Sequence, residues 1–189
     1  MDIQNCYVSA YEMRKKSPEK AIEMIEKCLT DNECSWLDLM RANLNLGLIY
    51  EEIKEYEKAE NSFRNALNAV PENLKDNYKS EISINILRVF LHKTDFCFSE
   101  HLYELYDSAI KANPFTLSMR NASFYLSLAS IIIAEHEKDN EKIKNAVNNA
   151  LSALNKNKRT ETDRILKRHR FTDDAFASDE ALKFLRKHI

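Results

Sequence analysis

A chain of 189 residues that contains one glycine, Gly47, and three prolines has few residues that form tight turns. A fold made of strands needs many such turns, because each hairpin reverses the chain within a few residues. Gly47 lies in "LGLIYEEIKEYEKAENSFRNALNAVP", a run of good helix formers. A glycine inside a helix costs about 1 kcal/mol relative to alanine. The shortage of turn residues predicts an all-α fold, and close packing is the expected compensation for Gly47.

Helix start and stop signals recur along the chain. Ser17 stands before Pro18 at the start of one helix, and Ser35 precedes Asp38 by three residues in a pattern typical of a capping box. Further capping signals stand at Ser99, Thr116, Thr160 and Ser178. The predicted helices cover about residues 3–14, 18–29, 36–53, 56–69, 74–92, 100–112, 117–136, 140–154 and 160–169, with a short last one from residue 179.

The quoted stretch also carries residues at fixed spacings. Leu46, Gly47 and Tyr50 are followed by a second set at regular offsets, which is Ala59, Phe63, Ala66 and Pro71. With these residues, segment 40–73 resembles a tetratricopeptide repeat, a 34-residue pair of antiparallel helices. Asn43 departs from the pattern, since the family often has tryptophan there. The resemblance implies that Gly47 and Ala59 lie where the two helices cross, with Tyr50 and Phe63 beside that contact.

Weaker copies of the pattern flank this segment. Helix-B positions are occupied by Ala21, Ile25 and Cys28 in segment 2–35, by Leu102, Tyr106 and Ala109 in segment 83–116, and by Ile143, Val147 and Ala150 in segment 124–157. The resemblance therefore implies one domain, 1–189, built as a right-handed superhelical α-solenoid of about four helix pairs. Residues 158–189 would be C-terminal capping helices, which cover the last apolar face of such an array.

In this family, one face of each first helix lines a concave groove that binds partner segments. The resemblance implies that the groove residues here are Arg41, Leu44, Asn45, Leu48, Leu87, Arg88, Leu91, Tyr125, Leu128, Ile132 and His136. The expected function is a non-catalytic adaptor or regulator that binds a protein or peptide segment. In the alternative, the C-terminal helices fill the groove and the chain is a self-associating structural module. Both a monomer and a homodimer are compatible with the sequence.

Some tetratricopeptide proteins hold the C-terminal carboxylate of a partner with five polar side chains. Asn45 and Arg88 match two of those positions, whereas Cys6, Ala10 and Ile84 occupy the others. This departure disfavours a receptor for chaperone tails. Contact of Arg41 and Arg88 with an acidic peptide stays open.

Residue patterns for catalysis or metal binding are sparse. His92, Cys97 and His101 are the nearest approach to a metal set, but no fourth ligand has suitable spacing. A core cysteine and surface histidines are the simpler interpretation. There is no glycine-rich phosphate loop, no nucleophile elbow and no H-E-x-x-H. We therefore expect no enzyme activity, no metal and no cofactor.

Charge is distributed unevenly along the chain. Acidic residues outnumber lysines and arginines by 14 to 9 over residues 1–73, while basic residues lead by 10 to 6 over residues 156–189. The segment "KNKRTETDRILKRHR", residues 156–170, could contact phosphate, so a nucleic-acid-linked regulator is a further alternative. A solvated capping helix explains the same segment, and it lacks the aromatic residues that stack on bases.

Targeting signals are not apparent in the sequence. The first residues, "MDIQNCYVSAYEMRKK", lack the basic start and apolar core of a signal peptide. The most apolar window, residues 124–134, is too short to span a bilayer. Four cysteines without a C-x-x-C pair fit a reducing compartment. A cytoplasmic location is therefore expected.

Overall fold

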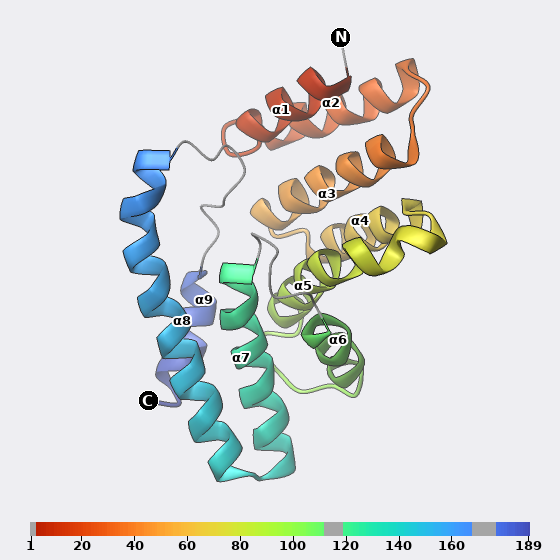
Figure 1. The fold of residues 1–189 in the computed structure, drawn as a ribbon. Helices are drawn as coiled ribbons and strands as arrows, with labels where there is room; N and C mark the ends of the chain where they lie inside the picture. Colours follow the sequence, from red (N-terminus) through yellow and green to blue (C-terminus); the bar gives the residue numbers. More distant parts are fainter. Residues whose placement is uncertain (1–2, 112–118, 168–176) are drawn as a thin grey trace. The chain divides into compact units, whose positions relative to one another are not determined.

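The computed structural model describes residues 3–111, 119–167 and 177–189 (Figure 1). Within these ranges all regular secondary structure is helical, which confirms the all-α prediction. The chain divides into two compact units, an N-terminal unit, Met1–Lys93, and a C-terminal unit, Thr94–Ile189.

The N-terminal unit contains two antiparallel helix pairs followed by a further helix (Figure 1). Its elements are α1 (Ile3–Met13), α2 (Pro18–Asp31), α3 (Trp36–Glu52), α4 (Tyr56–Ala69), the 3₁₀ turn η1 (Glu72–Leu74) and α5 (Lys75–Lys93). All five α-helices were predicted to within about two residues at each end, the usual ambiguity of helix ends. The exception is η1, which follows Pro71 and which the sequence did not predict.

The predicted capping box at the start of α3 is confirmed. The Ser35 hydroxyl accepts a hydrogen bond from the Asp38 amide at 3.2 Å, and the Asp38 carboxylate accepts one from the Ser35 amide at 3.1 Å. Two N–H groups that the first helical turn leaves unsatisfied thus gain partners. At α2 the expected Pro18 stands at the first helical position, but the Ser17 side chain makes no capping hydrogen bond.

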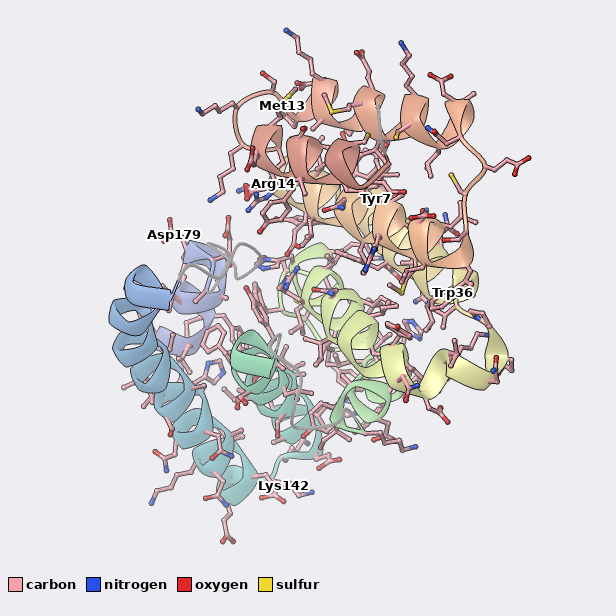
Figure 2. All side chains as sticks on the ribbon, turned by 45° about the horizontal axis from the view of Figure 1, so that its top comes forward. Tyr7, Met13, Arg14, Trp36, Lys142 and Asp179 are labelled. Carbon is pink, nitrogen blue, oxygen red and sulfur yellow. The ribbon has the colours of Figure 1, made fainter. Side chains whose placement is uncertain are left out.

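The first three helices share one apolar core. Its buried residues are Tyr7, Ala10, Ala21, Ile25, Ala42, Leu46 and Ile49. Tyr7, labelled in Figure 2, also donates a hydrogen bond from its hydroxyl to the carbonyl of Asp38 at 3.0 Å. Because three of these residues are alanines, the helices can approach one another closely.

The close contact at Gly47 is made by the ring of Phe63 on α4. A Cβ built on Gly47 would lie 2.5 Å from Cε1 of Phe63 and 2.7 Å from two more atoms of the same ring. The Phe63 ring therefore occupies the space that the missing side chain leaves. Ala59 and Ala66 are fully buried on the same helix. The expected close packing at Gly47 is confirmed, with the Phe63 ring directly against the glycine, and the pairing of Gly47 with Ala59 stays a prediction.

In the C-terminal unit, α7 (Met119–Glu137) and α8 (Asn140–Lys167) form an antiparallel hairpin, preceded by α6 (His101–Ile110) and followed by α9 (Asp179–Arg186) (Figure 1). The sequence wrongly predicted a break between residues 154 and 160. Helix α8 continues because this stretch contains neither glycine nor proline, and a Thr with acidic neighbours is tolerated inside a helix. A unit boundary at residue 157 therefore falls within a continuous helix.

The capping signals of this unit had mixed outcomes. The Ser178 hydroxyl accepts a hydrogen bond from the Ala181 amide at 3.0 Å, as expected for the cap of α9. Ser99 is not the cap of α6: Glu100 holds that position, and the Ser99 hydroxyl is buried without a hydrogen-bond partner among the described residues. Thr116 and Ala112, the last residue predicted for α6, lie outside the described residues.

The repeat pattern is buried to different extents along the chain. In segments 2–35 and 40–73, all three helix-B positions are buried. In segments 83–116 and 124–157, the middle or first position is only half-buried, at Tyr106 and Ile143 respectively. The helix-B spacing thus predicts burial best where the sequence match is strongest and in the segment just before it.

We expect the substitution Gly47→Ala to destabilise the protein. Overpacking against the buried Phe63 ring should cost about 1–3 kcal/mol, more than the gain of up to about 1 kcal/mol from helix propensity. Urea denaturation followed by circular dichroism measures the difference.

A second substitution tests the mechanism of that loss. Phe63→Leu in the Gly47→Ala background should cost less than the sum of the two single changes, because the smaller side chain leaves room for the new methyl group. A higher unfolding midpoint for Gly47→Ala alone would contradict the contact.

Candidate functional site

One stripe along α3 is left open to solvent in the N-terminal unit. Arg41 is exposed, and Leu44, Asn45 and Leu48 are half-buried. These residues stand at i, i+3, i+4 and i+7, so they share one face of the helix. Five other residues of α3 are buried, namely Met40, Ala42, Leu46, Gly47 and Ile49. We call Arg41, Leu44, Asn45 and Leu48 the α3 stripe.

The polar members of the α3 stripe have unused hydrogen-bonding capacity. Within the part of the chain that the structure describes, neither the Arg41 guanidinium nor the Asn45 amide has a hydrogen-bond or ion-pair partner. A guanidinium offers five N–H donors, and a carboxamide offers two donors and one acceptor. Beside them, Leu44 and Leu48 add apolar surface. The stripe can therefore contact both the polar and the apolar groups of a ligand.

Arg88, a predicted groove residue, is engaged inside the N-terminal unit. Its Nε and Nη2 donate hydrogen bonds to the two carboxylate oxygens of Glu51 at 2.7 and 2.5 Å. The two side chains are 5% and 14% exposed, so this bidentate pair is largely withdrawn from water. It joins α5 to the end of α3. Arg88 therefore already has an ion-pair partner inside the unit. A carboxylate from a ligand would have to displace Glu51 to bind it.

Most of the other predicted groove residues are buried. Leu87 and Leu91 on α5 are buried, and so are Tyr125, Leu128 and Ile132 on α7. His136 is exposed, but its ring stacks on Phe98 with centroids 3.6 Å apart. A role for these six residues in contacting a ligand stays a prediction. Among the predicted groove residues, the α3 stripe and His136 are therefore the ones whose side chains are not buried.

A second buried ion-pair group was not anticipated from the sequence. The carboxylate of Glu60 accepts hydrogen bonds from Lys93 at 2.6 Å and from Arg64 at 2.7 Å. Burial by itself raises the pKa of Glu60, but the hydrogen bonds from Lys93 and Arg64 outweigh burial and hold that pKa below its ordinary value. The i, i+4 spacing of Glu60 and Arg64 was a visible signal. The third member, Lys93, comes from 33 residues away.

The residues considered for a metal site have other partners. His92 stacks on Tyr56 at 5.6 Å between centroids, the Cys97 thiol donates to the carbonyl of Asp95 at 3.7 Å, and His101 contacts Glu104 at 3.1 Å. In the described residues, no three histidine, cysteine or acidic side chains are grouped so that they could hold a metal ion.

The buried thiol of Cys6 is poorly suited to nucleophilic chemistry. Burial, together with a side-chain hydrogen bond to Cys28, raises the pKa of Cys6 to about 12. The thiol also donates to the carbonyl of Met24 at 3.3 Å. Because the thiolate is the reactive form of cysteine, such a group stays inert at neutral pH.

The basic segment 156–170 begins on α8, which extends to Lys167. Its side chains, and all of residues 168–170, lie outside the described residues. The nucleic-acid alternative therefore gains no structural support. None of the described helices combines the length and the apolar character needed to cross a bilayer.

We expect removal of one member of the Glu51–Arg88 pair to be costly. Arg88→Met or Glu51→Leu leaves one charge buried and unpaired, which typically costs about 3–5 kcal/mol. The double variant should regain much of that loss, because it buries no charge. As a control, Lys58→Met breaks the exposed pair with Glu55, where at most about 1 kcal/mol is expected. Equal losses in all of these variants would contradict the burial of the pair.

The lowered pKa of Glu60 predicts a pH dependence of stability. A carboxylate with a lowered folded-state pKa stabilises the fold above its unfolded pKa of about 4.5, and this contribution is lost as the pH falls through the folded value. Glu60→Gln should therefore be less stable than the unmodified protein at pH 7, and the gap should narrow below about pH 4.5.

Urea midpoints measured between pH 7 and pH 3 check this prediction. Glu57→Gln on the exposed side of α4 is the matched control and should show little difference at any pH. A Glu60→Gln gap that widens on acidification would refute the assignment.

Comparison with known proteins agrees with the geometry of α3 and α4. A family model for the tetratricopeptide repeat matches residues 41–73. Neither the curated proteins nor the solved structures returned a match. The matched segment contains Gly47 and Phe63, which pack against each other, and the whole of the α3 stripe. The family match therefore covers one segment of the chain, residues 41–73, which has the sequence pattern of a tetratricopeptide repeat.

Proposed function

We propose that the protein is a non-catalytic adaptor or regulator that binds a peptide segment of a partner protein on the α3 stripe. Tetratricopeptide repeats generally mediate protein–protein interaction. The observation that carries the proposal is that Arg41 and Asn45, one helical turn apart, have no hydrogen-bond partner for their side-chain donors among the described residues and lie beside two half-buried leucines. A solvated arginine with an apolar flank is the kind of surface on which interfaces form.

The chemistry of the stripe favours an acidic, partly apolar ligand. Arg41 can receive a carboxylate in a bidentate pair, which is stronger than a neutral hydrogen bond. The Asn45 amide can bond both the N–H and the C=O of an extended peptide. An apolar side chain of the ligand would lie on Leu44 and Leu48. Arg88 is not part of this proposal, because its guanidinium is paired with Glu51.

The wider arrangement belongs to the same proposal. We infer a solenoid of about four helix pairs, in which the repeat at residues 41–73 is the best-matched unit. The four cysteines are free, which fits a reducing compartment, and we place the protein in the cytoplasm. Self-association is the second candidate function, and the docking of α9 described below favours it.

Charge reversal at Arg41 tests the peptide-binding proposal. An array of acidic 15-residue peptides identifies ligands of the unmodified protein, and fluorescence anisotropy gives their dissociation constants. Arg41→Glu should weaken these ligands at least tenfold, or about 1.4 kcal/mol, because attraction to a carboxylate becomes repulsion. Binding of the unmodified protein should also weaken as salt is raised.

The matched control is Lys27→Glu, a charge reversal at an exposed position on α2 in the same unit. It should leave the dissociation constants within about twofold, since it changes net charge equally but lies off the stripe. Leu48→Asp separately removes the apolar contact. Ligands that bind Arg41→Glu and Leu48→Asp as tightly as the unmodified protein would show that the stripe is not the binding surface.

A further inference from the structure

The short helix α9 is docked on the C-terminal unit by two side-chain contacts four residues apart. The ring of Phe184 stacks on Phe96, with centroids 5.2 Å apart and planes 19° from parallel. One turn later, Nε2 of His188 lies 2.9 Å from Oε1 of Glu135 on α7. Asp179, labelled in Figure 2, marks the start of the helix. The receiving surface is therefore an aromatic ring and a carboxylate.

The backbone that presents Phe96 is in an unusual conformation. Asp95 and Phe96 are consecutive non-glycine residues with positive φ angles of 49° and 58°. A bulky residue in the left-handed region is strained by about 1–3 kcal/mol and persists only where its surroundings compensate. The Phe96 ring is buried, and its stack with Phe184 supplies such compensation.

The helix itself depends on this surface. With eight residues, α9 is shorter than the length at which isolated helices are stable in water. Its apolar face consists of Ala181, Phe184 and Leu185, which are buried, while its charged residues are exposed. Packing against the docking surface therefore stabilises α9 as a helix, whereas the isolated segment would not be stably helical.

We propose that the surface formed by Phe96 and Glu135 is a helix-binding site that also accepts α9 from a second copy of this chain. The site needs an aromatic residue, small and apolar neighbours, and a hydrogen-bond donor four residues after the aromatic one. The α9 segment of another copy meets these requirements with the same residues. Eleven residues, 168–178, separate α8 from α9, and a chain of that length reaches at most about 36–40 Å. Exchange of α9 between two copies yields a closed dimer in which each copy completes the site of the other.

This inference is independent of peptide binding on the α3 stripe. It uses only residues of the C-terminal unit, so Arg41→Glu should not affect it. Failure of one proposal therefore leaves the other standing.

A labelled peptide with the sequence of residues 177–189 tests the site in the full chain. In the unmodified protein, the chain's own α9 competes at a high effective concentration. In the full-length Phe184→Ala variant that competition is weakened while the receiving surface is intact. We expect the peptide to bind this variant at least tenfold more tightly than the unmodified protein, by fluorescence anisotropy. A peptide carrying Phe184→Ala should bind neither.

Charge exchange provides a control for folding. His188→Asp places a negative charge against Glu135 and is a second way to release α9 should Phe184→Ala perturb the fold. A Glu135→Lys chain should lose the unmodified peptide and regain binding with a His188→Glu peptide. Circular dichroism confirms that each variant remains helical.

Mixing two full-length variants tests exchange between copies. Phe184→Ala lacks a competent α9, and Glu135→Lys lacks a competent site, so together they hold one functional pair. Sedimentation velocity should show a heterodimer in the mixture and less association in either variant alone. Absence of peptide binding to both Phe184→Ala and His188→Asp, or no association on mixing, would overturn the proposal.

Discussion

The seating of the Phe63 ring on Gly47 is the contact on which the N-terminal unit depends. It brings α3 and α4 together more closely than any side chain at residue 47 would permit. It also sets the rotation of α4, because Phe63 must face α3 while Ala59 and Ala66 are buried beside it. With that rotation, Glu60 is directed to a position where Lys93 of α5 can reach it. This packing requires a glycine at residue 47 and so compensates for the loss of helix propensity that a glycine causes.

Much of the helical framework was predictable from local signals. The bounds of α4, the capping box of α3 and the cap of α9 depend on residues a few positions apart, and such signals are visible in one sequence. The errors occurred where local signals compete. Around Thr160 the sequence contains a capping pattern but no helix breaker, and in the structure α8 continues through this stretch. The direct contact of Phe63 with Gly47 depends on the orientation of the ring, which residue spacing does not specify.

The candidate surface was only partly predictable, and two arginines show why. Arg41 and Arg88 were both predicted to line the groove. In the structure one is exposed, while the other pairs with Glu51, 37 residues earlier in the chain. An ion pair between side chains of two different helices depends on tertiary packing, which the spacing of residues within one helix does not predict. The same holds for the buried leucines of α5, whose burial depends on what packs over them and not on their periodicity.

The two buried carboxylates of the repeat also bear on where an independent folding unit ends. Glu51 on α3 and Glu60 on α4 both find their cations on α5, in Arg88 and Lys93. A fragment cut after Asn73 would contain the whole matched repeat and yet leave Glu51 without its cation and Glu60 with only Arg64. The smallest fragment that keeps these charges paired extends to Lys93, which is also where the N-terminal unit ends. The segment that matches the repeat is therefore shorter than the segment in which both carboxylates have their cationic partners.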